Sequence, residues 1–226
     1  GDVADGSITT AKLAADAVTA AKLADDSVVT ANITDGAVTA AKQSGSTVGA
    51  FAFGGDITEY ESGGTRYRVH TFLNSNRISF TGTLTCDYLI VGGGGGSAAA
   101  EGASGSTGGG GAGGMVVATS QSITAGNYDV VVGAGGAKST NAAAPSSNGG
   151  SSSFNSHIGL GGGGGTDYGT DSQTGGSGSG GSENAEPGAA STQNTYSGVT
   201  NVTGYGNAGG QGGNYDSVGG TVGSAG

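Results

Sequence analysis

Tryptophan is absent from this sequence, and proline, cysteine and methionine are nearly absent: the 226 residues include two prolines, one cysteine and one methionine. Because Cys86 is alone, one chain can form neither a disulfide framework nor a zinc site made of cysteines. We expect Cys86 to be a small buried residue of a strand. Only 34% of the residues are hydrophobic, so one large conventional core is not expected.

Positive charge is scarce as well. Seven Lys and Arg stand against 17 Asp and Glu, the net charge is −10, and Lys138 is the sole cation after Arg77. Nucleic acid is therefore excluded as a partner, because its phosphates are bound by Lys and Arg. No apolar run approaches the ~18 residues of a membrane-spanning helix, so we expect no membrane insertion.

Glycine is abundant instead, and it is concentrated in one part of the chain. Ten glycines lie in residues 1–90 and 43 in residues 91–226, starting with the run 92–96 directly after the apolar residues 88–91. Ordering glycine costs much conformational entropy, and glycine has no side chain to bury. A folded glycine segment must therefore be held by backbone hydrogen bonds between neighbouring segments.

A polyproline-II-type helix fits this requirement, because it makes no internal hydrogen bonds and directs all its amides outward. Several such helices can bond to one another where glycine allows close approach. The bulk composition also fits disorder, but apolar strand-like runs interleaved with the glycines argue against it.

A ten-residue repeat occupies residues 6–43, and a large apolar residue recurs in it every five positions. This spacing fits neither a helix nor a strand, and one such narrow stripe cannot make a core. Three copies around a common axis can, so we predict a trimeric stem over residues 1–50, with a flexible linker as the alternative. The predicted trimer-core residues are Ile8, Leu13, Val18, Leu23, Val28, Ile33 and Val38.

Strand patterns follow the repeat. Alternating or continuous apolar residues predict strands at 66–73, 77–80, 86–91, 115–118 and 128–132. Gly63 and Gly64 predict a hairpin turn. The expected fold is mainly β and fibrous: a trimeric stem, a small β domain at 51–91, and a glycine-rich distal domain at 92–226 that combines strands with polyglycine-II-type helices.

Two segments match nucleotide-binding motifs only in part. Residues 133–140 nearly form a phosphate-binding loop, but Ala137 replaces the required glycine and no helix follows. Residues 88–96 imitate a dinucleotide fingerprint and lack both the helix and the acidic residue that complete it. His70 and His157 are too few for a metal cluster within one chain, so we expect no metal, no cofactor and no catalytic residue.

The order of several motifs resembles the glycine-rich domain of bacteriophage tail fibres. The motifs are residues 67–72, 86–96, 108–117, 128–136 and 148–154. The ten-residue repeat resembles stem repeats of such fibres, notably those of phages that infect cyanobacteria. The two resemblances together cover roughly residues 5–165.

The resemblance implies a homotrimeric fibre of the virion that acts outside the cell. Its N-terminal side would join other tail or baseplate proteins. Its distal part would bind polysaccharide or an outer-membrane protein on the host surface. Glycine-rich tips of some phage adhesins are sandwiches of polyglycine helices whose loops bind the receptor.

Residues 166–226 match by composition alone, and their polar intervals 166–174, 182–201 and 214–218 are predicted loops. Tyrosine offers large contact area with a polar end and little entropy to lose. The alternative is that some tyrosines cover the glycine segments. The receptor-binding candidates are Asp167, Tyr168, Asp171, Glu183, Glu186, Asn194, Tyr196, Tyr205, Tyr215 and Asp216.

The expected function is thus that of a non-enzymatic, structural adhesin of a phage tail fibre. One alternative is a fibre-associated depolymerase of polysaccharide, although the scattered acidic residues select no catalytic pair. Another is a structural or ice-binding protein built from polyglycine helices.

Overall fold

The computed structural model describes residues 4, 7, 9, 49–99, 107–140, 145–167, 171–182 and 186–213. The chain divides into two compact units, residues 1–49 and residues 50–226. The predicted stem belongs to the first unit. Its predicted core lies outside the described residues, at Ile8, Leu13, Val18, Leu23, Val28, Ile33 and Val38.

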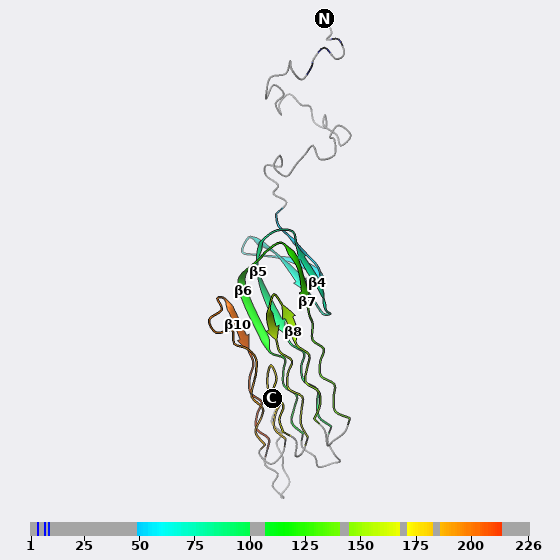
Figure 1. Cartoon of the computed structure of the whole chain (residues 1–226), viewed down its shortest axis with the longest axis vertical. Coiled ribbons are helices and arrows are strands. Elements are labelled where there is room, and N and C mark those ends of the chain that lie inside the picture. Colours follow the sequence, from blue (N-terminus) through cyan, green and yellow to red (C-terminus); the bar gives the residue numbers. More distant parts are fainter. Residues whose placement is uncertain are drawn as a thin grey trace. The chain divides into compact units, whose positions relative to one another are not determined.

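The second unit is mainly β, and its described residues contain no helix (Figure 1). The strands are β1 (Ala52–Phe53), β2 (Asp56–Ser62), β3 (Thr65–Thr71), β4 (Asn76–Phe80), β5 (Leu84–Val91), β6 (Met115–Ile123), β7 (Gly126–Val130), β8 (Ser152–Phe154), β9 (His157–Gly159) and β10 (Val202–Tyr205).

Two three-stranded antiparallel sheets, with strand orders β1-β4-β7 and β10-β6-β5, enclose the hydrophobic core. Alternate residues of β4 and β6 point into it, as expected for sheets with one solvated face. Two hairpins, β2-β3 and β8-β9, complete the set. The buried core residues are Ala52, Ile78, Phe80, Ile90, Val116, Ala118, Ile123, Phe154 and Val202.

The strands expected from apolar patterning are confirmed as β3 to β7. Gly63 and Gly64 form the predicted turn between β2 and β3, and both have positive φ, 59° and 76°, as two-residue hairpin turns require. Strand β2 was not predicted, because its sequence carries no run or alternation of apolar residues. Cys86 lies in β5, half-buried and packed against the core.

The predicted boundary between a small β domain and a glycine-rich domain, at residues 91 and 92, falls between strands that pair with each other. Strand β5 pairs with β6, and β4 pairs with β7, so strands from both sides of that boundary share the same sheets. Residues 50–226 accordingly form one compact unit. The glycine segments are excursions between paired strands.

These excursions run side by side beyond the strands (Figure 1). We call them the glycine bundle. It comprises residues 92–99, 107–114, 132–140, 145–151, 160–167, 171–182, 186–193 and 206–213.

Backbone hydrogen bonds join neighbouring segments of the bundle. The amides of Gly93 and Gly96 donate to the carbonyls of Gly150 and Ser147, at 2.9 and 3.0 Å. A Cβ atom on Gly113 would overlap the carbonyl oxygen of Gly92. The segments therefore pack backbone against backbone, at a separation that only glycine allows.

Candidate functional site

The described segments of the bundle end together on the side away from the sheets (Figure 1). Segment 92–99 leaves the sheets after β5 and segment 107–114 returns to β6; 132–140 leaves after β7 and 145–151 returns to β8. The described segment ends that are farthest from the sheets lie side by side: the Gly108 amide donates to the Thr166 carbonyl and the Ser139 amide to the Ser97 carbonyl. We call this end of the bundle the remote end (Figure 1). The connections themselves, 100–106, 141–144, 168–170 and 183–185, lie outside the described residues.

Three predicted contact residues are placed beside these connections. Asp171 is exposed and Glu186 is half-buried. Asp167 is only 2% exposed, so its side chain offers almost no surface to a partner. Tyr168 and Glu183 belong to the connections, and with Tyr215 and Asp216 they lie outside the described residues.

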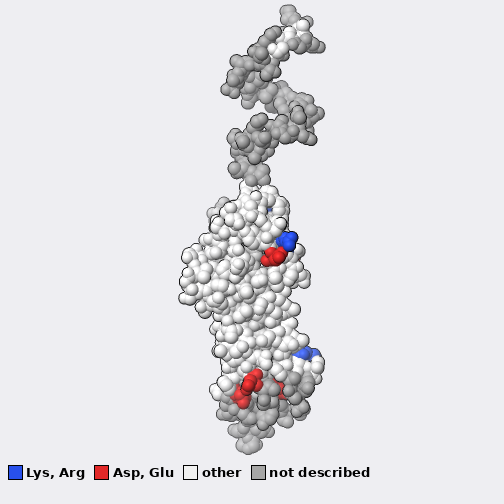
Figure 2. Space-filling model, in the orientation of Figure 1, with Lys and Arg blue, Asp and Glu red and all other residues white. Residues whose placement is uncertain are grey.

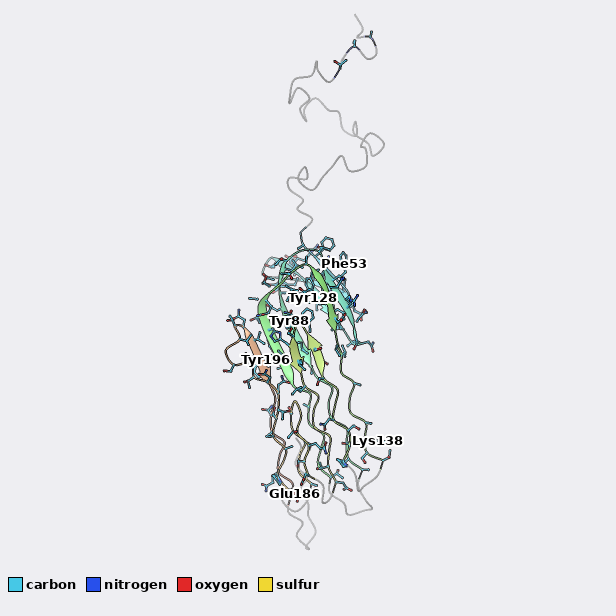
Figure 3. All side chains as sticks on the ribbon, viewed as in Figure 1. Phe53, Tyr88, Tyr128, Lys138, Glu186 and Tyr196 are labelled. Atoms are coloured by element: carbon cyan, nitrogen blue, oxygen red, sulfur yellow. The ribbon has the colours of Figure 1, made fainter. Side chains whose placement is uncertain are left out.

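The charge of the bundle is concentrated toward this end. Acidic side chains gather there, and uncharged surface separates them from the charges beside the sheets (Figure 2). Lys138 and Glu186 both lie toward the remote end (Figure 3). Among the described residues of the bundle, the charged side chains thus lie toward the remote end (Figures 2 and 3).

The other described candidates lie at the opposite end, next to the sheets. Tyr205 is the last residue of β10, where it pairs with Met115 and is exposed. Tyr196 lies close to β10 (Figure 3). Asn194 is near it, since its Oδ1 accepts a hydrogen bond from the Tyr196 amide at 2.8 Å. The structure therefore does not bring the described candidates together in one site.

Tyr196 is held by several contacts, which favours the structural alternative for this tyrosine. Its hydroxyl accepts a hydrogen bond from the Ile158 amide at 2.7 Å. Its ring meets the His157 ring edge-to-face at a centroid distance of 5.0 Å. Its φ of 56° is in the left-handed region, which a tyrosine adopts only where surrounding contacts impose it.

Gln193 is a residue that the sequence did not single out. It is 8% exposed, and its Oε1 accepts from the Leu160 amide at 2.8 Å while its Nε2 donates to the Ile158 carbonyl at 2.9 Å. It thereby fastens the returning segment 186–193 to β9. In the sequence it is one polar residue within a polar interval, and nothing marks it as buried.

The histidines have local partners. The His157 Nδ1 lies 2.7 Å from the Tyr88 hydroxyl, and burial lowers the pKa of the His157 imidazole and raises the pKa of the Tyr88 phenol. The His70 Nδ1 donates to the Gly54 carbonyl at 2.7 Å. Burial also raises the pKa of the Cys86 thiol, which disfavours its reactive thiolate form.

Two further findings bear on function. Within the described part of the chain, no three His, Cys, Asp or Glu side chains stand close enough to hold a metal ion. A search of the same residues found no helix with the length and apolar character needed to cross a membrane.

Comparison with known proteins identifies the glycine-rich part. A search of the curated proteins and a search of the solved structures each returned no match. The model of the glycine-rich domain family matches residues 73–226, which covers most strands of the sheets and the whole glycine bundle. The chain belongs to the glycine-rich domain family.

Proposed function

We propose that the glycine bundle consists of polyglycine-II-type helices. Such a helix has three residues per turn, so every third amide faces the same neighbour. In segment 107–114 the amides of Gly108, Gly111 and Gly114 donate to three carbonyls of segment 160–167, at 2.8, 2.7 and 2.7 Å. A β-strand would instead repeat every second residue.

Other segments support the same assignment. The Gly162 and Gly165 amides donate to Gly93 and Gly96, and the Gly178 and Gly181 amides donate to Asn207 and Gly210. All these bonds are 2.9 Å long. Each pair of donors is three residues apart, and so is each pair of acceptors. A bundle held in this way is a stiff support without a large apolar core.

We propose that the chain is the distal part of a bacteriophage tail fibre and that the bundle is its rigid support. The protein would be a structural, non-enzymatic component of the virion that attaches to the host surface. The observation that carries the proposal is that the described bundle segments end together away from the sheets, with Lys138 and Glu186 toward that end (Figures 1 and 3). Binding residues are commonly placed on loops that a rigid scaffold positions. The order of sequence motifs, which resembles phage fibres, supports the same conclusion.

The assembly and partners follow from this proposal. The stripe of the ten-residue repeat favours a trimeric stem, and the N-terminal side would join other tail or baseplate proteins. Three remote ends per fibre would bind the host surface together, so that weak individual contacts give a high overall avidity. Their acidic character favours neutral or basic groups on an outer-membrane protein or polysaccharide, or acidic polysaccharide bound through a bridging cation.

The test is binding of the purified, fluorescently labelled full chain to intact cells of a panel of cyanobacterial strains. We expect some strains to be stained and others not. Replacing residues 168–170 and 183–185 by Gly-Ser-Gly should reduce staining by about tenfold or more, because multivalency amplifies the loss of each contact. The control Tyr205→Ser, at the sheet end, should stain like the unmodified chain.

Two results would count against the proposal. Staining of every strain alike, or staining unaffected by the changes at the remote end, would remove the assigned role. Release of reducing ends from the polysaccharide of stained cells would favour the alternative, a fibre-associated depolymerase.

A further inference from the structure

The β2-β3 hairpin stands out because it is solvated on both faces. Every residue of the two strands is exposed except His70, which is partly buried. Neither strand packs extensively against any other strand of the described part. An isolated two-stranded hairpin is marginally stable in water, and a further layer or strand is normally needed to hold it.

The two faces of the hairpin differ in chemistry. Successive side chains point to opposite sides, so the strand register assigns each residue to a face. One face, which we call the ion-paired face, carries Glu59, Glu61, Arg66 and Arg68. Arg68 lies 2.7 Å from Glu59, and this hydrogen bond lowers the pKa of the Glu59 carboxyl.

The opposite face, which we call the tyrosine face, is uncharged over most of its length. Tyr60 and Tyr67 stack there with ring centroids 5.0 Å apart, and Val69 lies beside them. These three side chains are 53%, 43% and 39% exposed. The other members are Thr58, Ser62, Thr65 and Thr71, and the only charge is Asp56 at the base. Exposed apolar surface of this kind usually marks an interaction site.

We propose that the tyrosine face packs against the same face of other copies of this chain, so that three hairpins enclose a small apolar core around the trimer axis. The proposal rests on the trimeric stem of the proposed function. It adds a second, separate trimer contact, located in the unit of residues 50–226.

The distance along the chain favours a second copy as the occupant. The hairpin begins at Asp56, seven residues after Gly49, where the first unit ends. Seven extended residues reach at most about 23 Å, so copies joined by a stem hold their hairpins within reach of one another. Tethering of this kind raises the effective concentration of each face to roughly the millimolar range.

Charge favours the same occupant. The chain carries a net charge of −10, so most of its surface repels another copy. Two tyrosine faces would not repel each other in this way, because the only charged residue of each face lies at the base of the hairpin. A strongly basic or acidic partner would find no complement there. Like faces of identical chains can therefore meet without burying unpaired charge.

The test uses the full chain with Cys86→Ser, which removes the only native cysteine. Thr58→Cys places a thiol on the tyrosine face, and Ile57→Cys places one on the ion-paired face one residue away. Both positions are exposed, so both variants should fold. A short bismaleimide should join copies of Thr58→Cys about tenfold or more efficiently than copies of Ile57→Cys, because only contacting faces reach the high effective concentration.

Light scattering on the uncross-linked variants separates this inference from the stem. A trimeric mass with preferential cross-linking of Thr58→Cys supports both. A trimeric mass with equal cross-linking of the two variants, or with none, overturns the hairpin contact and leaves the stem in place. A monomeric mass overturns both.

Discussion

Gly113 and Gly109 lie four residues apart in one bundle segment, yet their surroundings differ. A Cβ atom on Gly113 would overlap the Gly92 carbonyl oxygen, whereas a Cβ atom on Gly109 would meet nothing within 4 Å. The need for glycine is thus a property of individual positions. It depends on whether a neighbouring backbone lies directly opposite.

We therefore predict that Gly113→Ala destabilises the protein and Gly109→Ala does not. Forcing one extra carbon into a packed site typically costs about 1–3 kcal/mol. At Gly109 the extra methyl group mainly restricts the unfolded chain, so the midpoint temperature of thermal unfolding should stay unchanged or rise slightly. Thermal unfolding followed by circular dichroism measures both. Equal midpoints for the two variants would argue against backbone-to-backbone packing of this segment.

Composition suggested candidate receptor-binding residues, but it did not show where each one lies. Asp167 is buried, Tyr196 is held by Ile158 and His157, and Gln193 was overlooked although it bonds two backbone groups. These outcomes depend on which segments of the bundle are neighbours. Nothing in a glycine-rich stretch specifies that, because its glycines carry no side chains to show a pattern.

Among the elements, apolar patterning found the strands that supply most of the core. It missed β2, whose residues are solvated on both faces and need no apolar alternation. It also missed the short strands β1, β8, β9 and β10. Strands β1 and β10 pair with the longer β4 and β6, and β8 and β9 pair with each other. Interpreting 182–201 as one loop was likewise incomplete, since segment 186–193 is part of the bundle.

The polyglycine-II assignment makes a prediction for amide exchange in segment 107–114. Gly108, Gly111 and Gly114 donate backbone hydrogen bonds, whereas the amides between them donate none in the described structure. Hydrogen exchange followed by nuclear magnetic resonance should therefore show slow exchange at every third residue. Protection at alternate residues would indicate β-strands instead, and uniformly fast exchange would indicate a disordered segment.

On the scale of the whole second unit, the chain leaves and re-enters the same sheets several times. Strands β5 and β6 are adjacent in the sheet, although residues 92–114 separate them in sequence. The change in composition at residue 91, where we placed a domain boundary, therefore falls between two neighbouring strands of one sheet. Sequence patterning locates single elements, but long-range pairing of this kind is set by packing between distant parts of the chain.

This organisation predicts that sheets and bundle unfold together. Tyr88 and Tyr128 belong to or pack against the sheet core, so their near-ultraviolet circular dichroism reports on the sheets. Slow exchange at Gly108 and Gly111 reports on the bundle. With both reporters followed as the temperature is raised, Gly113→Ala should lower two temperatures by the same amount. One is the midpoint of the circular dichroism transition, and the other is the temperature at which Gly108 and Gly111 lose protection. We expect equal shifts because residues 50–226 form one compact unit. Separate shifts would show two independent domains.

Close backbone contact in the bundle also restricts how such a protein evolves. A mutation that replaces Gly113 or Gly161 would add a Cβ atom that overlaps a neighbouring carbonyl oxygen. Positions with no backbone opposite them, such as Gly109, meet no such obstacle, so replacements there leave the glycine framework undisturbed. Related proteins can thereby differ in their surface residues while the glycine framework stays unchanged.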